Sequence, residues 1–454
     1  MPEDYGAIDM IAVFATITNL TVALEISQGI ARFYPEAKSE ADRIAYASSG
    51  LWFTLGAFGV FALFASIFSD SLTLLLIDSL KWQHVIRLAI IAIVLNSIFS
   101  FLQNLLRWQL KVKNYVISNI VFTLVTAAVA GFLVVVMKVG IAGVFYGQIA
   151  GAAAGGGMSC LFTRKSLKPV FVWNKCKEML SFSLPLVPSG IGVFVAHYVD
   201  RIAIKHLMTM SDVGLYGIGF RFAAVVSLLM VGFNSALTPL IYSNYKKAST
   251  PGDLSRIFRY FLAAAIPMVA TLSLFSHEIL RIFATPRYYS AWKVIPILSV
   301  SSLLFTMYIF APGLDILKRT RIVALIHVAA ALSNTFLNLT LIPVMGIAGS
   351  ALATLISASL TFSLYMVLSQ RYYPVPHKWL NLLGAVTVGL VVCLAGLILP
   401  SNIESAYPVT ILKSMFLVVG AFFVIWILLG SGEIKLVVNR ILKVAPTWNG
   451  DIRK

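Results

Sequence analysis

The chain has 454 residues, of which 59% are hydrophobic and 12% charged, and its mean hydropathy is +0.89. Soluble domains are about half apolar and a quarter charged, so this composition excludes a cytosolic enzyme, a disulfide-stapled secreted domain and a disordered tail. Only helices and closed barrels satisfy their backbones in lipid. Because the apolar runs are continuous over roughly 20 residues instead of alternating, they predict an all-α, polytopic membrane protein.

The apolar runs predict about thirteen transmembrane helices. In chain order they cover 5–30, 44–68, 84–107, 115–137, 140–162, 179–204, 213–241, 257–284, 290–313, 321–343, 346–369, 379–399 and 409–430. From their grouping we predict an N-terminal lobe at 1–165, a basic cytoplasmic hinge at 166–178, a C-terminal lobe at 179–370, an additional helix pair at 371–430 and an amphipathic tail at 431–454.

The net charge of +17 arises from 35 Lys and Arg against 18 Asp and Glu. These cations are scattered between the apolar runs, which favours basic cytoplasmic loops over a nucleic-acid site. Their distribution predicts that the hinge and the C-terminus are cytoplasmic. The three cysteines (Cys160, Cys176 and Cys393) are far apart, so we expect neither a metal site nor another cofactor.

An internal repeat relates the two lobes. Residues 4–34 match residues 212–242 at an offset of 208, and the Gly-Ile-Ala-Gly sequence at 140–143 recurs at 346–349. Repeats with the same orientation indicate two six-helix lobes that rock about a pathway between them. The first lobe has no apolar segment before Pro2, so we expect that its first helix is missing, either lost or excluded by a start assigned too late.

Short motifs lie along the chain at Pro2–Gly6, Arg32–Pro35, Phe182–Pro188, Asp200-Arg201, Asp212–Tyr216, Phe233-Asn234, Pro239 and Tyr242-Ser243. Together they resemble polysaccharide export flippases, the O-antigen and capsule branch of the multidrug/oligosaccharidyl-lipid/polysaccharide exporter superfamily. The resemblance implies a non-enzymatic flippase of the bacterial inner membrane. Its cargo would be undecaprenyl-pyrophosphate-linked oligosaccharide for O-antigen, capsule or exopolysaccharide assembly, moved by alternating access beside other polysaccharide assembly proteins.

Two other classes compete with the flippase interpretation. A multidrug or cation antiporter of the same superfamily would favour acidic residues deep in the first lobe, where Glu25 lies. A polysaccharide polymerase or ligase would carry a large outer loop with catalytic residues, and the sequence has no such loop. The sugar unit and the coupling ion cannot be predicted from the sequence.

Ionisable residues inside membrane segments are the first candidates for a binding site. Arg221 would bind the pyrophosphate with its guanidinium fork, or else extend to the interface as a snorkelling side chain. Glu25 would pair with an arginine or take up a coupling proton, or else make a structural hydrogen bond.

Four further charged residues lie near predicted helix ends. Asp200 and Arg201, with Lys205 one turn beyond, would form an exit gate or an interfacial ion pair. Arg32 would recruit the pyrophosphate at the opposite mouth, or simply belong to the cytoplasmic positive charge.

Pro185 and Pro188 predict a bend in segment 179–204, either a static kink or an element that straightens during transport. Gly151, Gly155, Gly156 and Gly157 predict a small-residue face for close helix packing, because no Gly-Lys-Ser/Thr nucleotide loop accompanies them.

Overall fold

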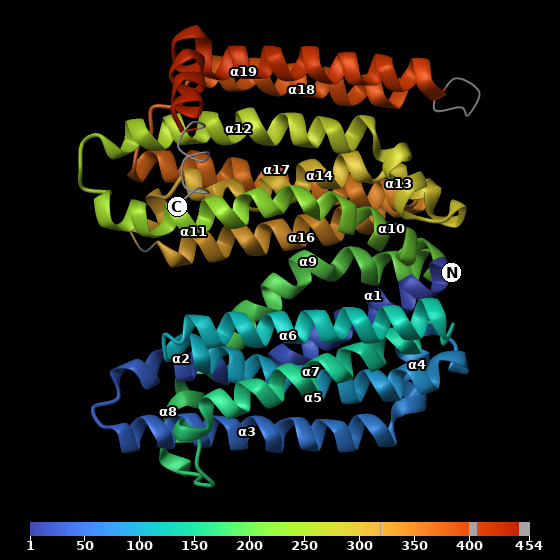
Figure 1. Ribbon diagram of the computed structural model, residues 1–454, viewed down its shortest axis with the longest axis vertical. Coiled ribbons are helices and arrows are strands. Elements are labelled where there is room, and N and C mark those ends of the chain that lie inside the picture. Colours follow the sequence, from blue (N-terminus) through green and yellow to red (C-terminus); the bar gives the residue numbers. More distant parts are fainter. Residues whose placement is uncertain (318, 399–405, 445–454) are drawn as a thin grey trace, which may run out of the picture. The chain divides into compact units, whose positions relative to one another are not determined.

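The computed structural model describes residues 1–317, 319–398 and 406–444 (Figure 1). Within these ranges the chain forms helices and turns without a strand. Nine helices of this described part are long and apolar enough to cross a membrane, and two shorter apolar helices accompany them. The protein is therefore an all-α, multi-pass membrane protein, as the composition predicts.

Contacts divide the chain into two units, one of Glu3–Ile202 and one of Ala203–Lys454 with Met1–Pro2. We call them the N-terminal unit and the C-terminal unit. The division falls inside α9 (Val187–Leu207), which lies later in the chain than the predicted hinge at 166–178. The predicted helix pair at 371–430 groups with the C-terminal unit. There α18 (Trp379–Ile398) and α19 (Ala406–Val444) both pack against α12 (Thr250–Leu274).

The N-terminal unit is built around a core that α2, α3, α5 and α8 share, with Ile26, Tyr46, Leu105 and Met179 among its buried residues. Its main helices are α1 (Pro2–Val22), α2 (Ile26–Glu36), α3 (Glu40–Ile67), α4 (Ser69–Ile77), α5 (Gln83–Trp108), α6 (Val112–Gly131), α7 (Ala142–Thr163), α8 (Trp173–Ser183) and most of α9. Short 3-10 turns precede α5, follow α7 and join α8 to α9, and a π-helical turn (Phe132–Val136) extends α6.

The basic connection between α7 and α8 is attached to α3 through hydrogen bonds. The backbone N–H of Lys168 donates to the Ser48 hydroxyl, and that of Val172 donates to the Ser49 hydroxyl, each at 2.9 Å. One turn into α8 (Trp173–Ser183), Lys175 Nζ lies 3.0 Å from Asp42 Oδ1. These contacts explain why α8 belongs to the N-terminal unit, although the sequence assigned residues from 179 onward to the second lobe.

Helices α6 and α7 approach each other closely along a glycine face. A Cβ at Gly147 would lie 2.8 Å from the Thr126 carbonyl oxygen, and one at Gly151 would lie 2.8 Å from the Phe122 carbonyl oxygen. Gly155 is similarly tight, whereas a Cβ at Gly157 would meet nothing within 4 Å. The packing face thus follows a spacing of four residues along α7, and it includes Gly147, which the sequence analysis did not name.

The C-terminal unit has one large core cluster that includes Phe261, Phe310, Leu314, Tyr365 and Leu428. Its helices are α10 (Met210–Ala223), α11 (Ser227–Asn244), α12 (Thr250–Leu274), α13 (Ser276–Phe283), α14 (Ile295–Leu304), α15 (Gly313–Ile316), α16 (Thr320–Met345), α17 (Ile347–Tyr372), α18 (Trp379–Ile398) and α19 (Ala406–Val444). Figure 1 shows α18 and α19 side by side, in agreement with their many contacts.

The repeat found in the sequence coincides with a repeated corner in the structure. Gly140 (φ 73°) and Gly346 (φ 60°) both have left-handed backbones, which glycine adopts without strain, and each precedes a long helix. Three residues later, Gly143 and Gly349 pack against the end of the preceding helix, where a Cβ would approach Val134 Cγ2 to 2.9 Å and the Leu341 carbonyl oxygen to 2.3 Å. The matched glycines therefore serve the same two functions in both units.

Several predicted spans are interrupted in the structure. Segment 5–30 breaks between α1 and α2, segment 179–204 breaks at a 3-10 turn (Leu184–Leu186), and segment 213–241 breaks at another (Ala224–Val226). Segment 290–313 is a short α14 followed by a 3-10 turn (Met307–Phe310) and α15. Hydropathy reports where apolar residues lie, but it does not report where backbone hydrogen bonds are broken.

Helix α19 is fixed to the C-terminal unit by an ion pair near each end. Lys413 Nζ lies 2.6 Å from Glu278 Oε1, and Arg259 Nη2 lies 2.9 Å from Glu433 Oε1. Between them, Gly430 (φ 68°, ψ 170°) interrupts the helix, and the part of α19 that follows runs in a different direction from the part before it (Figure 1). The predicted tail helix at 431–454 is thus present as far as Val444, and its remainder lies outside the described residues.

Candidate functional site

The junction between α1 and α2 is an unwound turn in the N-terminal unit. Leu24 (φ 48°) and Glu25 (φ 53°) are both left-handed, although neither is a glycine. Such backbones are strained for residues with a Cβ, and they persist only where surrounding contacts hold them. One such contact comes from the end of α8, where the Ser183 hydroxyl donates to the Leu24 carbonyl oxygen at 2.7 Å.

This turn borders a polar cavity of about 320 Å³ that lies entirely within the N-terminal unit. Side chains of α1, α2, α3 and α5 line it, and most of them carry hydroxyl or amide groups. The polar lining consists of Thr16, Asn19, Glu25, Ser27, Gln28, Thr54, Ser97, Ser100 and Asn104. Glu25 is the one ionisable residue among the described residues of this lining.

The Glu25 carboxylate makes neither a hydrogen bond nor an ion pair with any residue that the structure describes. It lies beside α9, because a Cβ at Gly190 would be 3.5 Å from Glu25 Oε1. Elsewhere in the cavity, the Ser97 hydroxyl donates to Asn19 Oδ1 at 2.5 Å and so joins α5 to α1. A half-buried carboxylate surrounded by hydroxyls and amides is suited to bind a polyhydroxylated ligand or a cation.

The polar residues of α1 and α5 are the part of this site that the sequence analysis missed. Ser97, Ser100 and Asn104 follow one another at spacings of three and four within an apolar segment. Thr16 and Asn19 lie three residues apart in another. This spacing places each set on one face of its helix. A polar stripe inside an apolar span was therefore the signal that could have identified the cavity.

The predicted charged residues of α9 are buried. Asp200, Arg201 and Lys205 are 4%, 6% and 7% exposed. Arg201 Nη1 lies 3.1 Å from Asp200 Oδ1 and also donates to the His197 carbonyl oxygen at 3.3 Å. Since Asp200 already neutralises Arg201, this pair has the geometry of a structural ion pair, and a gating function for it stays a prediction.

The remaining predicted residues lie at helix ends. Arg32 is exposed on α2 and pairs with Glu36 one turn later. Arg221 is exposed in the last turn of α10, just before the 3-10 turn that separates α10 from α11. Pro185 belongs to the 3-10 turn between α8 and α9, and Pro188 lies in the first turn of α9. Within the N-terminal unit, Arg32 does not line the Glu25 cavity, and Arg221 belongs to the other unit.

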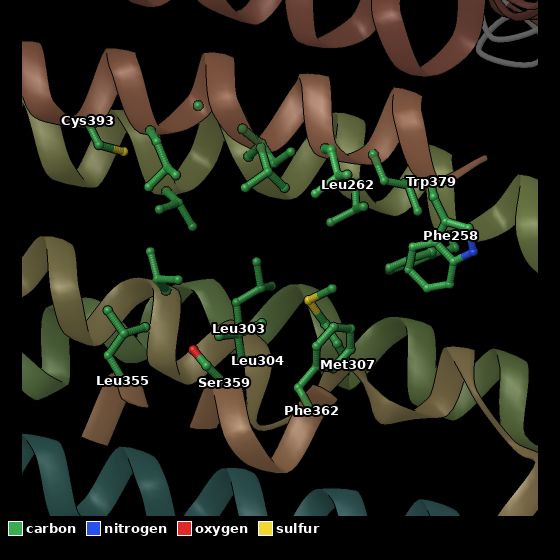
Figure 2. Close-up of a pocket in the computed structure, with 18 residues that line it drawn as sticks. Phe258, Leu262, Leu303, Leu304, Met307, Leu355, Ser359, Phe362, Trp379 and Cys393 are labelled. Carbon is green, nitrogen blue, oxygen red and sulfur yellow. The ribbon is translucent and has the colours of Figure 1, made fainter. Parts of the chain in front are cut away.

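A second pocket, of about 460 Å³, lies within the C-terminal unit between α12, α14, α17 and α18. Figure 2 shows Leu303, Leu304 and Phe362 facing Leu262 and Trp379 across it. The lining carries no charged residue, and Ser359 contributes its one hydroxyl. Such a surface accepts a hydrocarbon chain and offers almost nothing to a polar molecule.

Solved structures of two transporters have a fold similar to that of this chain. The inward closed conformation of the lipid II flippase MurJ matches with a TM-score of 0.65 and 16% sequence identity, over 92% of this chain and 96% of that one. An inward-facing multidrug resistance MATE family transporter of the MOP superfamily also matches with a TM-score of 0.65, at 14% identity over 82% of this chain and 91% of that one. The chain therefore has the fold of a MOP-superfamily transporter.

The sequence profile of the family described as "Polysaccharide biosynthesis protein" matches residues 1–311, and the chain belongs to this family. A probable low-salt glycan biosynthesis flippase, Agl15 of Haloferax volcanii, is 26% identical over 62% of this chain and 59% of its own length. The Lsg locus putative protein 1 of Haemophilus influenzae is 28% identical over 38% of this chain and 45% of its own length. The chain thus spans about half the length of these relatives. The family resemblance inferred from the sequence motifs is confirmed.

Proposed function

We propose that this protein is a flippase that moves a lipid-linked oligosaccharide across the membrane. The observation that carries the proposal is the contrast between two pockets, one in each unit. The Glu25 cavity combines hydroxyls, amides and one carboxylate with apolar side chains such as Phe58 and Phe101, whereas the C-terminal pocket is apolar apart from the Ser359 hydroxyl, the Trp379 indole N–H and the Cys393 thiol. An amphiphile with a sugar head and a hydrocarbon tail needs both kinds of surface.

The energetic problem of such cargo explains why a protein is required. Each sugar hydroxyl that enters hydrocarbon without a partner costs roughly 2–7 kcal/mol, so several hydroxyls together form a prohibitive barrier. Side chains such as Asn104 and Ser100 replace the hydrogen bonds to water that the sugar loses. The tail needs no such replacement and gains from apolar surface.

In this proposal the Glu25 cavity offers hydrogen bonds of the kind a sugar unit needs, and the pocket of Figure 2 offers apolar surface of the kind a lipid tail needs. The pyrophosphate requires a cation, and Arg221, with its exposed guanidinium, remains the proposed partner. We further propose that the lipid is an undecaprenyl carrier, that the protein lies in a bacterial inner membrane with a cytoplasmic C-terminus, and that no chemical bond of the cargo is broken.

A second candidate is a cation or multidrug antiporter, and one observation favours it. The Glu25 carboxylate, which has no partner among the described residues, is the kind of group that binds a proton or a cationic drug. In that case the neutral amide in Glu25→Gln would remove transport of cations, and it would leave surface glycan unaffected. A flippase should instead tolerate Glu25→Gln, because the glutamine side chain can still form hydrogen bonds with the sugar.

The cellular test is a charge reversal at Glu25 in a host that lacks its own flippase and depends on this chain. We expect Glu25→Lys to lower surface polysaccharide at least tenfold, because a lysine would fill the cavity and bind the anionic head in place. Glu36→Lys is the matched control, since it changes the same charge on the same helix outside the cavity. Surface polysaccharide should be quantified by immunoblot against protein level. Unchanged polysaccharide in Glu25→Lys would remove this cavity from the pathway.

A further inference from the structure

A third pocket, of about 440 Å³, lies where α19 is interrupted at Gly430. Its lining combines the start of α18, one residue of α12 and the end of the long part of α19. The residues are Arg259, Lys378, Leu380, Asn381, Trp426, Ile427, Leu428, Leu429 and Gly430. None of these residues lines the Glu25 cavity or the apolar pocket of Figure 2.

The interruption at Gly430 leaves carbonyl groups without helical partners, and two side chains satisfy them. Asn381 Nδ2 donates to the Ile427 carbonyl oxygen and Arg259 Nη1 donates to that of Leu428, each at 2.7 Å. Groups at a helix end must find such partners when they are buried. Side chains of both α12 and α18 therefore hold the end of the long part of α19 at this pocket.

The pocket contains cationic side chains whose N–H groups are not all paired with described residues. Arg259 is 6% exposed, and its Nε has no hydrogen-bond partner among the described residues. Lys378 is exposed, and its ammonium group makes no ion pair or hydrogen bond within that part of the chain. Glu433 is the acidic neighbour, and Arg259 at 2.9 Å and Arg256 at 4.0 Å already surround it.

The surroundings are those of a membrane surface. Trp426 and Leu380, at 50% and 85% exposure, present apolar area next to the cations. Tryptophan beside basic residues at the end of a transmembrane helix is typical of the headgroup region. His377 adds no charge at neutral pH, because burial lowers its pKa to about 4.

We propose that this pocket binds the phosphate of an anionic glycerophospholipid. Lys378 binds the phosphodiester, the buried guanidinium of Arg259 adds positive charge beneath it, and Trp426 lies against the glycerol and the upper acyl chains. Among the described residues, three cations (Arg256, Arg259 and Lys378) stand against the single carboxylate of Glu433, which favours an anionic lipid over a zwitterionic one. The lipid would complete the junction of α12, α18 and α19.

Lys378→Gln tests the site without disturbing a buried group, and Lys246→Gln is its matched control. Lys246 is also exposed, lies in the connection before α12 and does not line the pocket. The purified full chain in detergent would be titrated with phosphatidylglycerol, with phosphatidylcholine and with inorganic phosphate, and thermal melting would report binding. We expect phosphatidylglycerol to stabilise the wild type and Lys246→Gln, and to bind Lys378→Gln about tenfold more weakly.

Three outcomes would overturn the proposal. Equal stabilisation of wild type and Lys378→Gln would exclude Lys378 as the phosphate ligand. Equal stabilisation by phosphatidylcholine would exclude recognition of net charge. Stabilisation of wild type, but not of Lys378→Gln, by inorganic phosphate alone would assign the pocket to a free phosphate rather than a lipid.

Discussion

Replacing Lys413 by methionine is expected to destabilise the protein by about 3–5 kcal/mol, because it leaves a charged partner unpaired in a buried site. Lys413 is 1% exposed, and its Nζ lies 2.6 Å from Glu278 Oε1. The other carboxylate oxygen of Glu278 has no partner among the described residues, so the lysine is its main source of compensation. Thermal melting of the purified variant in detergent would measure the loss.

The double variant Lys413→Met with Glu278→Gln separates charge from packing. Removing both charges should recover most of the stability that the single variant loses, since a buried ion pair contributes little beyond its own desolvation. If Lys413→Met melted like the wild type, the ion pair would not hold α19 to α13. If the double variant were as unstable as the single one, packing of the lysine stem would account for the loss.

Replacing Gly151 by leucine is expected to prevent close packing of α6 on α7, at a cost of roughly 3 kcal/mol or more. A Cβ at this position would lie 1.9 Å from Thr126 Oγ1 and 2.8 Å from the Phe122 carbonyl oxygen. The second contact is with backbone, so a change of rotamer cannot relieve it. The folded yield of the N-terminal unit should therefore fall, as measured by size-exclusion chromatography of the solubilised full chain.

Gly157→Leu is the control for this prediction, because it lies on the same helix and its Cβ would meet nothing within 4 Å. Leucine is a better helix former than glycine by roughly 1 kcal/mol, so this variant should be at least as stable as the wild type. Equal folded yields for the two variants would show that the glycine face does not determine the packing of α6 on α7.

Hydropathy predicted most of the fold because spans are set by bilayer thickness. The segments 44–68 and 84–107, for example, correspond to α3 (Glu40–Ile67) and α5 (Gln83–Trp108) within a few residues. The repeat also marked Gly140 and Gly346 as equivalent positions, and the structure shows a positive φ at both, which glycine adopts without strain.

The break at Glu25 could not be predicted in the same way. Leu24 and Glu25 have no local reason to leave the helix, and a hydrogen bond from Ser183, far away in the sequence, holds the unwound turn. By contrast, the interruption of segment 290–313 had a local signal in Pro296 and Pro312, which the sequence analysis did not use. The sequence thus identified Glu25 as a candidate residue but did not predict the cavity that surrounds it.

The central claim is that the protein moves a lipid-linked oligosaccharide between leaflets, and reconstitution tests it most directly. Purified protein would be placed in vesicles that contain a lipid-linked oligosaccharide in both leaflets, with a membrane-impermeant glycosidase added outside. We predict that nearly all of the substrate becomes cleavable with wild-type protein and only the outer half with Glu25→Lys. Cleavage that stops at half with wild-type protein, as in protein-free vesicles, would contradict the account.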